Sequence, residues 1–152
     1  MHDVFRVLRT AGSALSTQRL RLNVIANNIA NVNTTRTADG GAYHRRRMVV
    51  EPKERAFQLP LPPSFAAAST FGPDDSIAGV KATRILTDDT PGPRVYEPGH
   101  PDADADGYVE YPNVDVVTEM TDMISATRSY QANVTVIDSI KQLAMKALEI
   151  GR

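Results

Sequence analysis

The distribution of proline is the feature of this sequence that most limits its possible folds. All ten prolines lie between Pro52 and Pro112, so both ends of the 152-residue chain are free of proline. Proline breaks a helix because it lacks the amide hydrogen and its ring clashes with the preceding turn. Long helices are therefore expected at the two ends, on either side of a middle segment that must fold in another way.

The N-terminal segment, residues 3–32, is predicted to form one long helix. Apolar side chains recur along it at alternating steps of four and three residues, a period that keeps one stripe facing a partner helix. Leu20 and Val24 lie off this stripe, and the Asn-rich residues 31–35 are expected to end the helix because asparagine tolerates the left-handed conformation. The one polar member of the stripe, Gln18, is interpreted as a position that sets helix register. The stripe consists of Val4, Leu8, Ala11, Leu15, Gln18, Leu22, Ile25, Ile29 and Val32.

Residues 113–152 are predicted to form a second long helix, capped by Asn113 or Asp115. This helix carries two apolar stripes about 100° apart, the rotation of a single residue. A helix covered by one neighbour needs one stripe, so the second stripe predicts burial from a second direction. The first stripe is Val116, Met120, Met123, Thr127, Tyr130, Val134, Ile137, Lys141, Ala144 and Leu148, and the second is Val136, Ile140, Leu143, Ala147 and Ile150.

The middle of the chain, residues 35–112, is predicted to be a small β-rich insert with a Pro-rich loop near 57–76. Four stretches are typical of strands: residues 43–51, 77–86, 94–97 and 108–111. The predicted fold class is therefore α+β, with terminal helices packed as a coiled-coil-like domain around this insert. The helical domain would be formed by residues 1–34 and 113–152.

The apolar surface of the two helices exceeds what this chain can cover by itself. In an ordinary helical hairpin the extra apolar residues would rest on the insert, but the helices are much longer than an insert of this size. Terminal helices that contact non-equivalent patches on neighbouring copies generate an open helical array. We therefore expect assembly through the helices. The residues predicted to lie at helix interfaces are Val4, Leu8, Leu15, Leu20, Leu22, Val24, Ile25, Ile29, Met120, Met123, Ile124, Tyr130, Val134, Val136, Ile137, Ile140, Leu143, Leu148 and Ile150.

Composition excludes several classes of protein. The formal net charge of −1 offers no general attraction for nucleic acid, and the absence of cysteine excludes disulfides and thiol catalysis. Charges at Asp3, Arg6 and Arg9 interrupt the apolar run that a cleavable signal peptide requires, and no segment reaches the ~18 apolar residues of a membrane span. If the protein works outside the cytoplasm, we expect export by a route that reads no cleavable signal.

An acidic turn at residues 102–107 resembles the start of an EF-hand calcium loop, with Asp at positions one, three and five and Gly at six. The twelfth position should be a Glu that binds through both oxygens, but Asn113 stands there. Prolines also occupy the place of the entering helix. We interpret the segment as an acidic turn before a strand, with a calcium-stabilised adaptor as the alternative. The candidate ligands are Asp102, Asp104 and Asp106.

The basic residues 44–47 and the region around His100 are the remaining candidates for other chemistry. Residues 44–47, His-Arg-Arg-Arg, are interpreted as a salt-bridging or solvated surface, because no aromatic platform for nucleic-acid bases accompanies them. Their pairing with the acidic turn of another subunit is a hypothesis. The sequence contains no phosphate-binding loop and no nucleophile motif. An enzyme would have to be a small hydrolase centred on His100, and we predict that the chain is not an enzyme and needs no cofactor.

Residues 13–35 resemble the N-terminal signature of the flagellar rod and hook protein family. Similarity to the proximal-rod members of that family extends over residues 35–46, 98–115 and 119–133, whereas residues 57–77 resemble nothing that we can place. The residues of the family motifs are Ala26, Asn27, Asn28, Asn31, Asn33 and Thr34 near the N-terminus and Tyr130, Gln131 and Ala132 near the C-terminus.

This resemblance implies a structural subunit of the proximal rod in the periplasm, exported by the flagellar type III apparatus. The helices would form the inner tube of a hollow, torque-transmitting shaft, and the insert would face outward. The implied partners are copies of the chain, other rod proteins and adjoining basal-body components, with no nucleic acid and no membrane span.

Overall fold

A computed structural model describes residues 2–38, 40–53 and 79–150 of the chain. Along the chain, one long helix, α1 (His2–Ala30), comes before four strands, and a second, α3 (Val116–Ile150), follows them. The strands are β1 (Arg46–Pro52), β2 (Val80–Thr87), β3 (Arg94–Tyr96) and β4 (Tyr108–Glu110). This arrangement confirms the predicted α+β class, in which terminal helices flank a small antiparallel insert.

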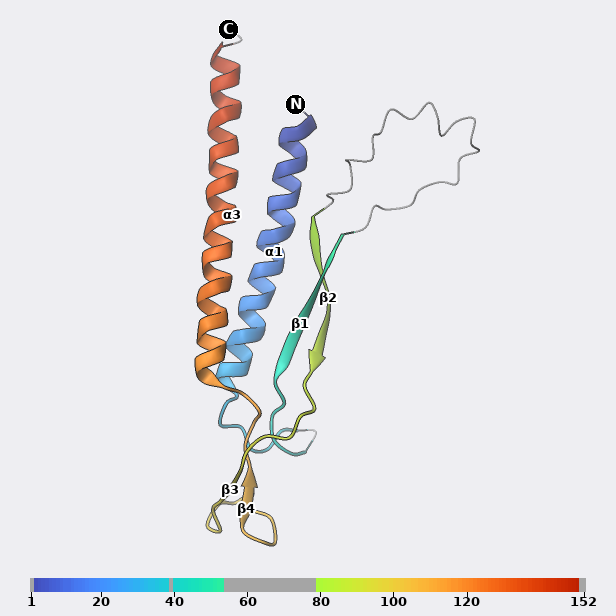
Figure 1. Ribbon diagram of the computed structural model, residues 1–152, viewed down its shortest axis with the longest axis vertical. Helices are drawn as coiled ribbons and strands as arrows, with labels where there is room; N and C mark the ends of the chain where they lie inside the picture. The colour runs from blue at the N-terminus through green and yellow to red at the C-terminus, as the bar shows by residue number, and fades with distance from the viewer. Residues whose placement is uncertain (1, 39, 54–78, 151–152) are drawn as a thin grey trace, which may run out of the picture.

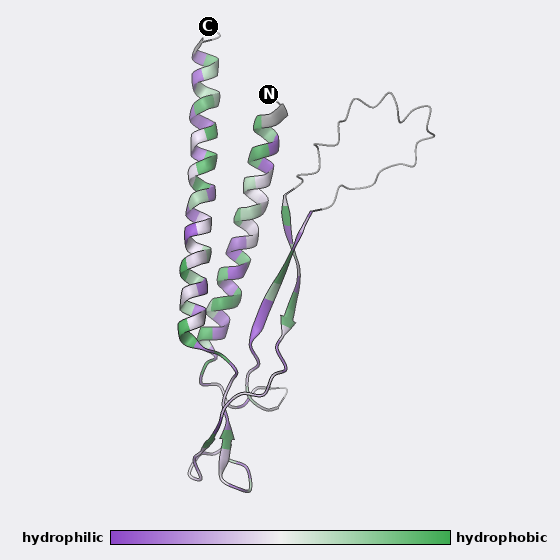
Figure 2. Ribbon diagram, viewed as in Figure 1, coloured by the Kyte–Doolittle hydropathy of each residue, from purple (hydrophilic) through white to green (hydrophobic). Residues whose placement is uncertain are grey.

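The helices α1 and α3 lie side by side and antiparallel, and the C-terminal end of α3 extends beyond the start of α1 (Figure 1). The last residues of α3 therefore lack a helical neighbour in the same chain. Apolar residues continue along this overhanging end (Figure 2). None of the described helices is long and apolar enough to cross a membrane.

The stripe that α3 turns towards α1 differs from the predicted one. Among the described elements α3 packs only against α1, so its least exposed positions are those that face α1. Every second one of these positions lies one residue before the predicted position, so that Glu119, Ala126, Asn133 and Ile140 take the places predicted for Met120, Thr127, Val134 and Lys141. This rotation leaves Met120 and Val134 exposed. The observed stripe is Glu119, Met123, Ala126, Tyr130, Asn133, Ile137, Ile140 and Ala144.

The β1–β2 hairpin covers a second face of α1. Both strands contact α1, and the Val80 amide donates a hydrogen bond to the Ser13 hydroxyl at 3.1 Å. Gly79 is required at this contact, since its φ is +96° and an added Cβ would lie 2.3 Å from the Ser13 oxygen. The hairpin explains why Val24 is buried. The prediction that Val24 points towards a neighbouring subunit is therefore wrong.

Register determines which side chains of this hairpin face outward. Val49 pairs with Arg84 and Val50 with Ala82, so Thr83 is an extra residue that forms a β-bulge. Because successive side chains point to opposite faces, one face carries the apolar residues that approach α1. Val50 and Ile85 of that face are nevertheless 43% and 49% exposed. The opposite face, called the outward face below, consists of Arg47, Val49, Glu51, Lys81, Arg84 and Leu86.

The β3–β4 hairpin projects from the end of the molecule opposite the helix termini (Figure 1). Val95 and Val109 pair on one face, and Val109 is almost completely buried. On the other face the rings of Tyr96 and Tyr108 form an edge-to-face pair with centroids 5.3 Å apart. The hairpin makes no packing contact with the other described helices and strands.

Candidate assembly surface and polar junction

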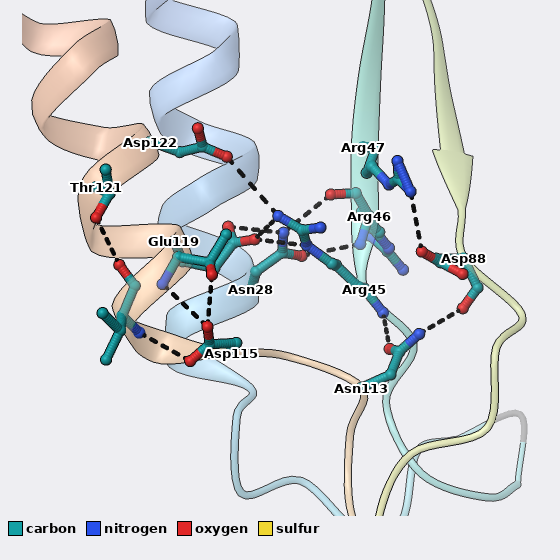
Figure 3. A network of polar contacts seen from close by, with 12 residues as sticks. Asn28, Arg45, Arg46, Arg47, Asp88, Asn113, Asp115, Glu119, Thr121 and Asp122 are labelled. Carbon is teal, nitrogen blue, oxygen red and sulfur yellow. Dashed lines mark hydrogen bonds and ion pairs between the residues drawn. The ribbon is translucent and has the colours of Figure 1, made fainter.

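A buried polar junction forms where α1 ends and where β1 and α3 begin (Figure 3). At its centre is Asn28, whose side chain is 1% exposed. The Asn28 amide nitrogen donates to the Arg46 carbonyl at 2.9 Å and to Glu119 Oε2 at 3.1 Å. Its oxygen accepts the Tyr43 hydroxyl at 2.9 Å and the Arg46 amide at 3.0 Å. The full hydrogen-bonding capacity of one amide thus joins three segments far apart in sequence.

Glu119 supplies the buried charge of this junction. It is 1% exposed and lies in the first turn of α3. Its Oε1 atom accepts the Arg45 Nε–H at 2.6 Å, and the Arg45 guanidinium also lies 3.7 Å from Asp122. A carboxylate buried this deeply is stable only when paired and hydrogen-bonded, and both conditions are met here. The ion pair therefore ties the entrance of β1 to α3.

Asn113 extends the junction to the end of the β1–β2 hairpin. Its side-chain oxygen accepts the Arg45 amide at 2.7 Å, and its nitrogen donates to the Asp88 carbonyl at 2.9 Å. The Asp88 carboxylate in turn pairs with Arg47 at 3.3 Å. Of the two predicted caps of α3, Asn113 and Asp115, it is Asp115 that has that role. Its carboxylate accepts the Val117 and Thr118 amides.

Three ionisable groups at the junction have shifted pKa values. Burial raises the pKa of Tyr43, with the Arg46 guanidinium opposing the shift and Glu119 adding to it. The hydroxyl of Thr118 lowers the pKa of Asp115, and the hydroxyl of Thr90 lowers that of Asp88. Each shift favours the protonation state in which the group makes its hydrogen bonds.

The asparagines of the family motif have two different roles. Asn27 and Asn31 bond to backbone carbonyls four residues earlier, at Asn23 and Asn27, as expected near a helix end. Asn28 does not, because it faces β1 and α3 instead. The sequence pattern did not single out its partner, since neither predicted apolar stripe includes Glu119.

The predicted interface residues fall into three groups by exposure. Val24 and Ile25 are buried within the chain. Met123, Tyr130, Ile137 and Ile140 face α1 within the chain. The side chain of Ile150 lies outside the described part of the structure, and contacts of the exposed residues with other subunits remain a prediction. The half-buried residues are Leu8, Leu15, Leu20, Leu22, Ile29, Met123, Tyr130, Ile137 and Ile140. The exposed residues are Val4, Met120, Ile124, Val134, Val136, Leu143 and Leu148.

The acidic turn does not bring its carboxylates together. Asp102 accepts a hydrogen bond from the Thr35 hydroxyl at 2.8 Å and pairs with Arg36, whereas Asp104 pairs with Arg94 and accepts the Tyr108 amide. Asp106 is exposed. No group of three or more His, Cys, Asp or Glu side chains within the described ranges is placed to hold a metal ion.

The basic cluster is also used within the chain. Arg45 and Arg47 pair with Glu119 and Asp88, and Arg46 stacks over the Tyr43 ring at 5.7 Å. The hypothesis that this whole cluster meets the acidic turn of another subunit is therefore wrong for Arg45 and Arg47. The interpretation as a salt-bridging surface describes Arg47, whereas Arg45 pairs with a buried carboxylate.

Comparisons with known proteins agree with this architecture. Residues 8–36 match the family model for the flagella basal body rod protein, and residues 105–150 match the C-terminal model of the flagellar basal body rod FlgEFG protein. The flagellar basal-body rod protein FlgC of Bacillus subtilis is 40% identical, over 97% of this chain and 98% of its own length. The chain belongs to the FlgC family of flagellar basal-body rod proteins.

Two other FlgC proteins show the same degree of similarity. FlgC of Borreliella burgdorferi is 44% identical over 97% of each chain, and FlgC of Salmonella typhimurium is 40% identical over 98% of each chain. As a member of the FlgC family, the chain is a structural subunit of the flagellar rod and not an enzyme. It belongs to the basal body, where it assembles with copies of itself and with other basal-body components.

Proposed function

We propose that this rod subunit transmits torque within a hollow proximal rod, and that apolar residues on the outer side of α3 are buried between subunits. The exposure of those residues carries the proposal. Leu143 and Leu148 are 68% and 72% exposed, although burying a leucine side chain contributes about 1.5–3 kcal/mol. A helix with such residues on its free side gains stability from a neighbour.

The rotation of α3 supports this assignment. The helix turns Ala126, Asn133 and Glu119 towards its own partner helix and leaves Met120 and Ile124 exposed. Ala126 leaves room for α1 to approach closely, and Met120 and Ile124 remain available for other subunits. Residues 1–34 and 113–152 would then form the assembly domain, and residues 35–112, with the loop near 57–76, the outward-facing insert.

The polar junction supports a mechanical role. Asn28, Glu119 and Arg45 connect the helices to the insert through buried, directional bonds, so the two parts resist rotation relative to each other. Torque applied to the helices would therefore be transmitted to the insert and to the basal-body components that contact it. In this proposal the rod lies in the periplasm, and the subunit reaches it through the flagellar type III export apparatus. A chain without cysteine suits passage in an unfolded state into an oxidising space.

A substitution on the outer side of α3 tests the proposal. In a strain that lacks its own copy of the protein, Leu143→Asp should reduce swimming at least tenfold and remove the subunit from purified basal bodies. The matched control is Gln142→Glu, which adds the same charge at the preceding exposed position and should leave both measures near the wild-type level. Normal incorporation of the Leu143→Asp protein would refute burial of this side of α3 between subunits.

A further inference from the structure

The chain carries two regions of opposite charge, which meet within one molecule at the Arg47–Asp88 ion pair. Residues 88–111 include seven Asp or Glu and a single Arg, whereas the β1–β2 hairpin, residues 45–53 and 79–87, includes six Arg or Lys and a single Glu. The β3–β4 hairpin lies at one end of the molecule, and the β1–β2 hairpin lies beside α1 (Figure 1). The two hairpins make no packing contact with each other.

The outward face of the β1–β2 hairpin has the character of a binding surface. Lys81 and Arg84 are exposed beside Leu86, which is 46% exposed. A hollow of about 400 Å³ adjoins this face, lined by Arg47, Met48, Val49, Leu86, Thr87, Asp88 and Asp89. Arg47 pairs with Asp88. Among the described residues, Lys81 and Arg84 supply the remaining positive charge of this face, with Glu51 opposite Lys81 and Asp89 at the rim.

The β3–β4 hairpin presents complementary groups. Register places Arg94, Tyr96, Tyr108 and Glu110 on its free face. Tyr96 is 62% exposed and Tyr108 also faces solvent, and the Arg94 guanidinium stacks on Tyr108 at 5.3 Å while it pairs with Asp104. Glu110 and Asp106, on this face and in the adjoining turn, are exposed carboxylates that pair with no cation among the described residues.

We propose that the tyrosine-bearing face of the β3–β4 hairpin docks on the outward face of the β1–β2 hairpin of a second copy of this chain. Tyr96 or Tyr108 would occupy the hollow beside Leu86, and Asp106 and Glu110 would approach Lys81 and Arg84. Exposed tyrosine rings are common anchors of protein interfaces. Opposite charges on the two faces favour this orientation over the pairing of two like hairpins.

The position of the hairpins makes this contact heterologous. Each copy has one donor face at its end and one acceptor face along its side, so a neighbour displaced along the long axis can bring the two together. Repetition of such a contact extends an open helical array. The inference rests on the proposed assembly of rod subunits, but it assigns a contact to the insert that the helices do not make.

Cysteine cross-linking tests the contact directly, because the chain has no cysteine of its own. A chain with both Asp106→Cys and Arg84→Cys should give disulfide-linked oligomers of this chain in isolated basal bodies after mild oxidation. A chain with Asp106→Cys and Glu149→Cys is the control and should stay unlinked, since Glu149 lies at the far end of α3. Absence of linked chains in basal bodies that contain the first variant would overturn the contact, and linkage to a protein of another mass would overturn the second copy as partner.

Reversing the charges of both faces tests the contact independently. A variant that merely misfolds would not be rescued by a second set of charge reversals. Reversal of one face, by Lys81→Glu with Arg84→Glu or by Asp106→Lys with Glu110→Lys, should reduce swimming at least threefold. All four substitutions together should restore at least half of the loss. Failure of the combined variant to exceed either single-face variant refutes the hairpin contact, whereas the Leu143→Asp result bears on the helices alone.

Discussion

Removal of the Glu119 carboxylate should destabilise the folded chain more than any change on its surface. In Glu119→Ala the Arg45 guanidinium loses its main partner, and the Asn28 amide loses one of its two acceptors. Breaking a buried ion pair by deleting one member costs about 3–5 kcal/mol. Arg45 is 22% exposed and keeps Asp122 within 3.7 Å, so we expect the lower end, about 3 kcal/mol. For a chain of this size that corresponds to a melting temperature lower by about 6–12 °C.

Urea denaturation followed by far-ultraviolet circular dichroism measures this loss in the purified chain. Glu149→Ala, at an exposed position of the same helix, is the control and should change the unfolding free energy by less than about 0.5 kcal/mol. A second variant, Arg45→Met with Glu119→Leu, replaces the ion pair by apolar groups. It should lose less stability than Glu119→Ala, because no unpaired charge is left buried.

Two results would refute this reasoning. If Glu119→Ala lost less than about 1 kcal/mol, the carboxylate would not be the buried charge that the packing indicates. If the losses from Arg45→Met and Glu119→Leu simply added in the double variant, the two groups would not be energetically coupled.

Three smaller perturbations test other parts of the structure. Within the described residues the Gln18 side-chain oxygen is buried without a hydrogen-bond partner, so Gln18→Leu should raise the unfolding free energy by about 1 kcal/mol in thermal melts. Asp115→Ala removes the cap of α3 and should lower the melting temperature by about 2–4 °C at pH 7. Because the folded state lowers the pKa of Asp115 below 3.8, the stabilisation is present above that pH, and the difference from wild type should disappear as the pH falls through the lowered pKa. Gly107 has a φ of +80°, and an added Cβ would lie 2.9 Å from the Tyr96 ring. Gly107→Ala should therefore speed amide exchange in β3 and β4 and leave α1 unchanged.

The sequence alone determined the elements of this fold. Ten prolines confined to residues 52–112 and a 3.5-residue apolar period place both helices, and α1 ends within two residues of the predicted position. Strand positions were also predicted, although β1 begins at Arg46 rather than at residue 43. Tyr43 and Arg45 instead bond to Thr34 and Asn113. These features are local, since they depend on residues close together in the chain.

Only the tertiary structure decided which face of each helix is free. The apolar period of α3 fits two orientations one residue apart, and packing on α1 selected the one in which Glu119 and Ala126 face inward. The role of Asn28 likewise depends on Tyr43, Arg46 and Glu119, which come from three segments of the chain. A hydrogen-bond partner 91 residues away leaves no periodic trace in a sequence, because burial and pairing arise only when those segments come together.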